Sequence, residues 1–256
     1  MKKLSHILKG IAIKLREKTY KSNGTRCKYL IFDNPKSNIL IVGFQACASP
    51  PVYNYVRSLN GINAVRLYIK DDYAKDHRGS YYLGECAKHN VEKTVIELIN
   101  MQVDLIKSRH NNISKIVFIG SSKGAYAALN FSMYYKNAVA VIASPQYLLG
   151  NYLNCDIMKE QIIDIIGNVT NENIEFLNNR LKNIIKEKGE KNRPTIYIHY
   201  SDSEHTYFEH ISYLLNDLNN ANISVFEDVQ HYQQHGDLYK YYPKYLVDTV
   251  KKIIEC

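Results

Sequence analysis

Residues 116–129 read IVFIGSSKGAYAAL, the most informative stretch of the chain. It begins with an unbroken apolar run, which is typical of a strand buried on both faces of a sheet. Residues 120–124 then match the pattern G-x-S-x-G, and small residues follow where a helix would begin. A nucleophilic serine on such a tight turn has a strained backbone, and side chains two residues away on either side would collide. Gly120 and Gly124 relieve this crowding, so the pattern predicts Ser122 as a nucleophile.

A serine nucleophile also needs hydrogen-bond donors for the charge that develops on the substrate carbonyl oxygen. The helix expected after Ser122 directs its first amides and the positive end of its dipole toward that charge. We expect the Lys123 amide as one oxyanion donor and an amide from the loop after an early strand, Phe44 or Gln45, as the second. A phosphate-binding loop fits less well, because Lys123 precedes the last glycine and no Walker pattern surrounds it.

The acid of a catalytic triad should follow a strand later in the chain than Ser122. Asp202 lies just beyond the strand-like segment 195–200 and is the preferred acid. Glu204 is its nearest competitor. Asp228 is a weaker choice, because it is close in sequence to the expected histidine.

The histidine should lie on the loop between the last strand and the last helix. His235 is followed by Gly236 and directly precedes the terminal helical pattern, so we prefer it to His231. His199 falls within a strand-like segment and is expected to be a packing residue.

Segments with strand and helix patterns alternate along the chain. The expected strands are 27–33, 38–44, 63–69, 115–119, 138–143, 195–200 and 223–227, and the expected helices are 50–59, 88–108, 125–135, 205–218 and 239–254. This alternation predicts an α/β fold with a mostly parallel sheet covered on both faces. Residues 150–190 carry helical patterns without a strand, so we expect a helical insertion or cap there.

The N-terminal segment has a basic and amphipathic pattern. We expect a helix over residues 1–20, packed on a single domain of residues 21–256, with attachment to a membrane surface as the alternative. Lys9, Lys14 and Arg16 interrupt its apolar residues and no small-residue cleavage site follows, so we expect a mature cytoplasmic protein.

Composition excludes several classes of function. No apolar run is long enough to span a bilayer. The five cysteines are widely spaced without a C-x-x-C pair, so we expect neither a disulfide framework nor a structural zinc site, and no metal. Cys47 is expected to be a small buried residue. The net charge of +8 suits an anionic partner. The sequence has no nucleic-acid-binding signature, so we do not expect the protein to bind DNA or RNA.

The loop at residues 71–82 follows the expected strand 63–69 and should reach the same edge of the sheet as Ser122. It combines acidic residues with Arg78, Tyr81 and Tyr82. Such side chains suit a polar, hydroxyl-rich ligand, and we treat these three as candidate substrate-binding residues. The alternative is a solvated surface loop.

Five short blocks of the chain resemble a known family. In chain order they are Gly79–Tyr82, Ile119–Gly124, Ala143–Gln146, Ser201–Asp202 and His235. They resemble the α/β-hydrolase-fold O-acetyltransferases of bacterial capsular polysaccharide synthesis. The serine turn is also similar, more distantly, to hydrolase-like glycan-modifying components of accessory secretion systems.

This resemblance implies an α/β-hydrolase fold and a triad of Ser122, Asp202 and His235. It also implies acetyl-CoA as acyl donor, a capsular or other cell-surface polysaccharide as acceptor, and contact with the inner membrane face or the capsule-assembly machinery. The alternatives are an esterase of the same fold and a non-catalytic glycan-binding component. The triad does not distinguish transfer from hydrolysis, and the sequence leaves the acceptor sugar and the oligomeric state open.

Overall fold

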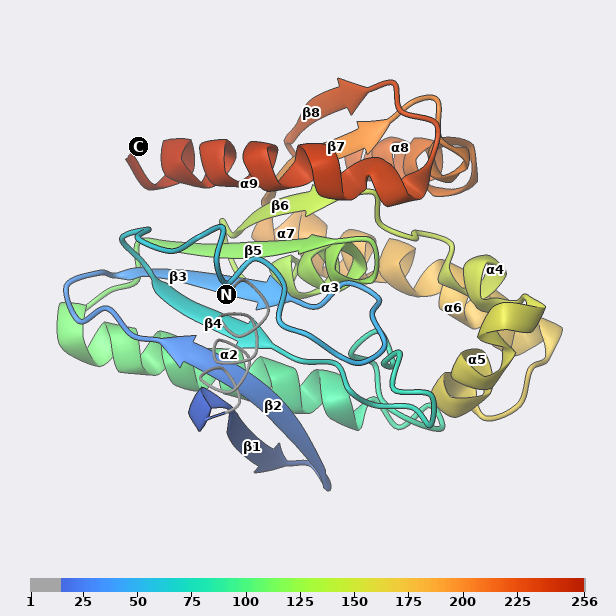
Figure 1. Ribbon diagram of the computed structural model, residues 1–256, viewed down its shortest axis with the longest axis horizontal. Coiled ribbons are helices and arrows are strands. Elements are labelled where there is room, and N and C mark those ends of the chain that lie inside the picture. Colours follow the sequence, from blue (N-terminus) through green and yellow to red (C-terminus); the bar gives the residue numbers. More distant parts are fainter. Residues whose placement is uncertain (1–14, 256) are drawn as a thin grey trace, which may run out of the picture.

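A computed structural model describes residues 15–255, in which eight strands form one sheet (Figure 1). The strand order is β1-β2-β4-β3-β5-β6-β7-β8. The strands are β1 (Lys18–Ser22), β2 (Thr25–Phe32), β3 (Ile39–Phe44), β4 (Val65–Ile69), β5 (Lys115–Ser121), β6 (Val139–Ala143), β7 (Thr195–Ser201) and β8 (Val225–Gln230). β2 pairs antiparallel with both β1 and β4, whereas β4, β3 and β5 to β8 run parallel. The carboxyl ends of the parallel strands therefore meet at one edge of the sheet, where α/β proteins bind ligands.

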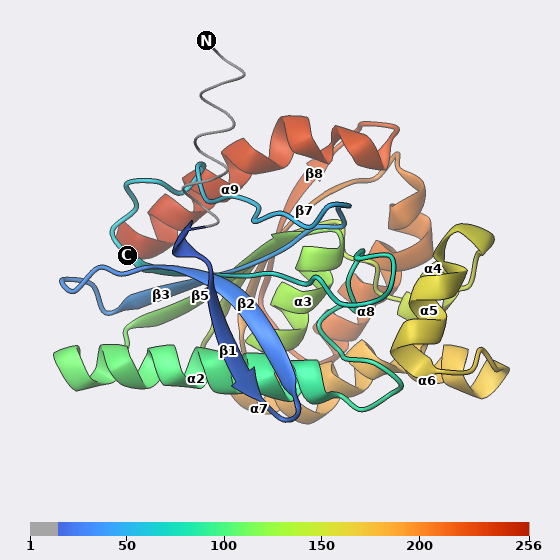
Figure 2. The same cartoon turned by 60° about the horizontal axis from the view of Figure 1, so that its bottom comes forward.

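Helices cover both faces of this sheet (Figure 2). They are α2 (Asn90–His110), α3 (Lys123–Ser132), α4 (Leu149–Leu153), α5 (Lys159–Ile166), α6 (Asn171–Ile184), α7 (Glu190–Asn192), α8 (Ser212–Asn220) and α9 (Leu238–Glu255), with short helical turns η1 (Asp156–Met158), η2 (Ile185–Gly189), η3 (Tyr207–Ile211) and η4 (His235–Asp237). On one face, α9 packs its apolar stripe on the side chains of β3, β5 and β6. On the other face, α2, α3 and α8 share the larger core.

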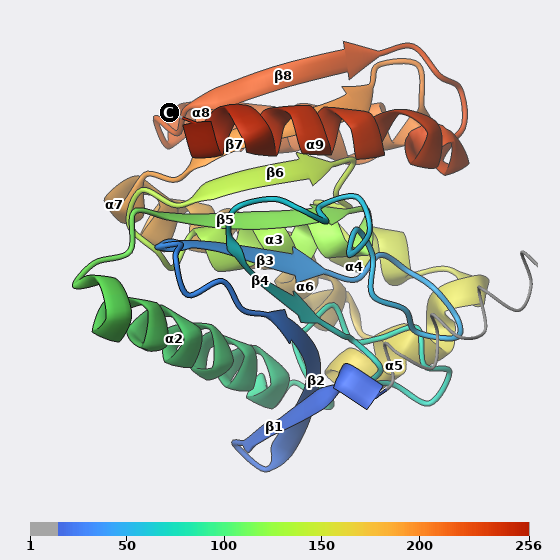
Figure 3. The same ribbon diagram turned by 60° about the vertical axis from the view of Figure 1, so that its left-hand side comes forward.

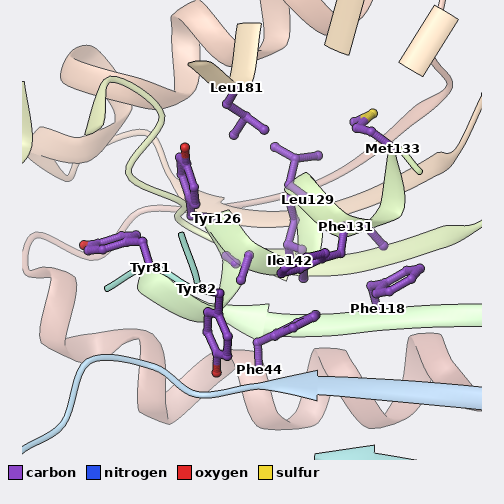
Figure 4. Packing of buried hydrophobic residues seen from close by; sticks show 14 of the residues in the cluster. Phe44, Tyr81, Tyr82, Phe118, Tyr126, Leu129, Phe131, Met133, Ile142 and Leu181 are labelled. Atoms are coloured by element: carbon purple, nitrogen blue, oxygen red, sulfur yellow. The ribbon is translucent and has the colours of Figure 1, made fainter. Parts of the chain in front are cut away.

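Aromatic side chains form the part of this larger core under the serine turn (Figure 4). Phe44 at the end of β3 stacks on Phe131 of α3, with ring centroids 5.1 Å apart. Tyr82 packs edge-on against Phe44 at 5.0 Å, and Tyr81 packs edge-on against Tyr126 at 5.5 Å. The core thus fixes β3, α3 and the loop after β4 relative to one another.

The expected helical insertion lies between β6 and β7, with no strand between them. Its helices α4 and α5 lie beyond the carboxyl ends of the parallel strands (Figures 1 and 3). Two backbone hydrogen bonds, from Cys86 to Asp164 (2.9 Å) and from Ala87 to Ile165 (2.8 Å), join α5 to the loop after β4. The insertion is therefore attached at the edge of the sheet where Ser122 lies.

Three expectations about the first third of the chain differ from the structure. Cys47, expected to be buried, is exposed. The helix expected over 50–59 is absent, and a turn lies there instead. Tyr55, in the middle of this span, has a positive φ of 62°, a left-handed conformation that interrupts a helix. The helix expected over 1–20 falls mostly outside the described residues. Only Leu15 and Arg16 of that span are described as helical, and Lys18–Ser22 is strand β1, paired with β2.

Candidate active site

Ser122 lies on the turn between β5 and α3, at the carboxyl edge of the sheet. Its backbone has φ 52° and ψ −121°, a strained conformation for a residue other than glycine. Its amide donates to the Ala143 carbonyl at 2.8 Å, which ties the turn to the end of β6. A Cβ at Gly120 would overlap the Gly124 backbone, and one at Gly124 would lie 2.7 Å from the Phe44 carbonyl oxygen. The two glycines are thus needed for the turn and for its contact with β3.

His235 lies at the start of η4, and its acidic partner is Glu204. The Nδ1 atom of His235 is 2.5 Å from Glu204 Oε1. The Glu204 side chain is 0% exposed, and Thr206 also donates to its Oε1. A buried carboxylate on Nδ1 fixes the imidazole so that Nε2 is free to act as a base.

Asp202 does not make the contact with His235 that the sequence led us to expect. Its carboxylate lies 2.8 Å from His231 Nδ1, and the two side chains are 40% and 76% exposed. The Asp202 amide bonds the Gln230 carbonyl, which holds this residue in line with β8 at the surface. The hydrogen bond from His231 lowers the pKa of Asp202. Of the two carboxylates after β7, Glu204 therefore reaches His235.

The Ser122 hydroxyl oxygen is 2.9 Å from Gln146 Nε2, which donates to it. Gln146 follows β6 and is fully buried. The buried His235 Nε2 has no hydrogen-bond partner within residues 15–255. Gln146 was assigned no role from the sequence. The signal that could have identified it is its place just after a buried strand, beside the strand that carries Ser122.

The expected oxyanion donors differ in how available they are. Lys123 is the first residue of α3, where amides lack acceptors within the helix. The Gln45 amide, in contrast, donates to the Tyr82 hydroxyl at 2.7 Å, so it is already paired. Phe44 is the last residue of β3, and its ring lies in the core.

The Lys123 side chain turns away from the serine into a buried ion pair. Its ammonium lies 2.9 Å from the Asp71 carboxylate and 2.7 Å from the Arg78 carbonyl, and both Lys123 and Asp71 are fully buried. Asp71 also accepts the amides of Ser80 (2.8 Å) and Tyr82 (3.3 Å). The ion pair therefore fastens the loop after β4 to the first turn of α3.

The three candidate substrate-binding residues of that loop have structural contacts. Tyr82 is fully buried and donates to the Ile69 carbonyl at 2.9 Å, so it belongs to the core and does not face a ligand. Tyr81 is also buried. The half-buried Arg78 donates to the Ile157 carbonyl of η1 at 3.1 Å. The loop is packed between the core and the insertion, and its Asp71 carboxylate pairs with Lys123 of α3 and does not face a ligand.

A buried histidine, His210, lies near the half-buried His235. His210 is 2% exposed, and its Nδ1 accepts the Leu148 amide at 3.2 Å. Burial, with the nearby His205 and His235, lowers the pKa of His210 to about 4. His199 is buried as expected, and its Nδ1 pairs with the Asp228 carboxylate at 2.6 Å.

Within the described part of the chain, no group of three or more His, Cys, Asp or Glu residues could hold a metal ion. In that same part, every helix is too short or too polar to cross a membrane.

Solved structures similar to this chain include the capsule O-acetyltransferase of Neisseria meningitidis serogroup A, in a mutant form in complex with CoA (TM-score 0.71, 20% identity, covering 92% of this chain and 95% of that one). They also include an S-formylglutathione hydrolase from Agrobacterium tumefaciens (TM-score 0.65, 10% identity, covering 92% of each chain). The chain has the α/β-hydrolase fold. This confirms the fold expected from the sequence, helical insertion included.

The Glycosylation Associate Protein (Gap123) complex from Streptococcus agalactiae is a further neighbour (TM-score 0.76, 17% identity, covering 94% of this chain and 46% of that one). The neighbours thus include both groups that the sequence resembled, and at these identities they show the shared fold. No protein-family model matches the chain, and no curated protein matches it in sequence.

Proposed function

We propose that the protein is a serine-dependent O-acyltransferase that moves an acetyl group from acetyl-CoA to a hydroxyl of a capsular or other cell-surface polysaccharide. The observation that carries this proposal is the combination of a strained Ser122 on its turn with a histidine held by a buried carboxylate. The triad in this proposal is Ser122, His235 and Glu204, with Glu204 in the place first given to Asp202.

The proposed reaction has two halves. Ser122 Oγ attacks the thioester carbonyl while His235 Nε2 takes the serine proton, and the thiolate of CoA leaves with that proton as a thiol. The Lys123 amide stabilises the oxyanion, a contribution of about 3 kcal/mol for such a donor. An acceptor hydroxyl then attacks the acetyl-serine and gives its proton to His235, which returns it to Ser122.

Two further observations support this donor and acceptor. A neighbour with the same fold is a capsule O-acetyltransferase with CoA bound. The net charge of +8 suits the phosphates of CoA and an anionic polysaccharide.

The test is intact-protein mass spectrometry after brief exposure to acetyl-CoA. We expect an acetyl adduct on the wild-type protein and none on Ser122→Ala. The adduct should be discharged faster by capsule oligosaccharides than by water. Discharge at the same rate with and without saccharide would identify an esterase, and a wild-type protein without an adduct from acetyl-CoA would contradict the proposal.

A further inference from the structure

Gln146 is held rigidly against the nucleophile by the segment that carries it. Ser144 adopts a left-handed backbone with φ 39°, and its amide donates to the His199 carbonyl at 3.1 Å. On the other side, the Tyr147 hydroxyl donates to Asp217 at 2.6 Å. Both ends of the short segment around Gln146 are therefore fixed to neighbouring elements, and a strained backbone of this kind is common at functional sites.

The orientation of the Gln146 carboxamide follows from its two neighbours. Nε2 lies 2.9 Å from Ser122 Oγ and 3.5 Å from the Ser144 carbonyl oxygen. A carbonyl oxygen repels another oxygen, so the NH₂ group is the one that faces this position. The Gln146 Oε1 atom is buried and has no partner within the described residues. A buried acceptor without a donor is costly, which points to a ligand group that supplies one.

The strand order shows from which side Gln146 approaches the serine. β3 and β6 flank β5 on opposite sides, and β7 and β8 lie beyond β6. Gln146 therefore approaches Ser122 from the side that carries Glu204 and His235, opposite the loop after β3. An acceptor hydroxyl must give its proton to His235 Nε2, so it enters on the same side as Gln146.

We infer that Gln146 is a specificity-determining residue that selects a polyhydroxylated acceptor over water or a simple alcohol. This inference rests on the proposed acyl-serine function. Once Ser122 carries an acyl group, its Oγ is an ester oxygen and a weaker acceptor, so the Gln146 NH₂ group is released. The carboxamide then offers one donor and one acceptor, which pair with two neighbouring hydroxyls of a sugar.

For its covalent bonds, the transfer step uses only the acceptor, the acyl-serine and His235. The acceptor O–H bond breaks and its proton passes to His235 Nε2, while the acceptor oxygen forms a bond to the acyl carbon. The bond from that carbon to Ser122 Oγ then breaks, and Oγ takes the proton back from His235. Gln146 Nε2 donates again to the departing Oγ.

The test uses p-nitrophenyl acetate as donor, with glycerol or methanol as acceptor, on the full chain. The burst of p-nitrophenol measures acylation, and the ratio of acetyl ester to acetate measures how the acyl-enzyme is discharged. We expect the wild-type protein to transfer the acetyl group faster to glycerol than to methanol at equal concentrations of hydroxyl groups. Gln146→Met should lower that preference at least tenfold, because a site built for hydroxyls loses selectivity when its polar partner is removed. The preference is a ratio of products from one acyl-enzyme, so it is measured independently of the burst rate.

Two further variants test the role of the amide donor and control for the effect of a Gln→Met substitution elsewhere. Gln146→Glu retains the shape and an acceptor but loses the donor, and it should also lose the preference for glycerol. Gln233→Met, at an exposed glutamine of the loop before His235, should keep the wild-type preference.

Three outcomes would overturn the inference. The first is a wild-type protein without preference for glycerol, and the second is an unchanged preference in both Gln146 variants. The third is a large loss of burst rate with the preference intact, which would limit Gln146 to positioning the nucleophile. A wild-type protein that gives no burst and also forms no acetyl adduct from acetyl-CoA would instead overturn the acyl-serine function, and the acceptor role with it.

Discussion

At the scale of single residues, two carboxylates follow β7 and only their surroundings separate their roles. Glu204 is withdrawn from water and bonded to His235, whereas Asp202 is 40% exposed and bonded to the exposed His231. A buried, hydrogen-bonded carboxylate holds one tautomer of its histidine, while an exposed pair contributes little, about 1 kcal/mol or less.

This contrast gives a prediction about turnover. Glu204→Gln should lower kcat by about 10³-fold or more, because an amide at this position no longer stabilises the imidazolium that forms. Asp202→Asn is the matched control and should stay within about twofold of wild type. Steady-state hydrolysis of p-nitrophenyl acetate measures both, and a larger loss in Asp202→Asn would restore Asp202 as the acid.

The acid could not be chosen from sequence because both carboxylates lie within two positions of each other on the same turn. Strand and turn patterns place that turn to within a residue or two, but they do not say which side chain points inward. Ser122 and its glycines were more predictable, since the conformation of the turn restricts the residue types there. Gln146 has no such restriction, because any polar residue after β6 fits the pattern.

At the scale of elements, the contact between α3 and the loop after β4 depends on one buried ion pair. The sequence placed Lys123 beside the nucleophile and Asp71 in a candidate binding loop, 52 positions away. Their pairing requires the tertiary structure. It turns that loop into a support for the serine turn, and its tyrosines pack in the core.

Removing one partner of this pair should destabilise the fold. Lys123→Met leaves the Asp71 carboxylate buried without its cation, so we expect the free energy of unfolding to fall by about 3–5 kcal/mol. Urea denaturation followed by circular dichroism measures this loss.

The double variant Lys123→Met with Asp71→Asn should recover part of the loss, because the unpaired charge is then gone. Asn keeps an oxygen that can accept the Ser80 amide. A double variant as unstable as the sum of the two single variants would argue against a direct coupling between the two side chains.

At the scale of the whole molecule, burial of histidines makes stability depend on pH. The pKa of His210 falls to about 4, because burial and nearby histidines disfavour its charged form. In the unfolded chain its pKa is about 6.5, so below that pH the unfolded state binds a proton that the folded state does not. Stability therefore falls as the pH drops from about 6.5 toward about 4.

We expect the free energy of unfolding to fall by about 2 kcal/mol between pH 7 and pH 5 because of His210. His199, whose pKa burial also lowers, should add to this loss in the same direction. Urea denaturation at the two pH values measures it. In His210→Asn, whose oxygen can accept the Leu148 amide, the difference should shrink by a similar amount, and an unchanged difference would show that other groups carry the pH dependence.

The overall arrangement was largely predictable because it depends on repeated patterns. Buried apolar runs identified the inner parallel strands such as β3 and β5, and the segment between β6 and β7 showed helical spacing without a strand. The first part of the chain was less predictable. Lys18–Ser22 is short, polar and at the edge of the sheet, so it lacks the apolar signal of the inner strands. At residues 50–59, the leading prolines suggested the start of a helix, but Tyr55 has a left-handed backbone that no sequence pattern revealed.

The position of the helical insertion determines which part of the chain can differ in length among related proteins. It begins at Leu149 and ends at Asn192, so Ser122 and Gln146 come before it and Glu204 and His235 come after it. Its two ends connect neighbouring parallel strands, and lengthening such a connection costs little free energy. Related chains can therefore acquire longer, shorter or different insertions while the reacting groups stay in place. The fold thus places the reacting side chains outside the segment that can vary in length and sequence.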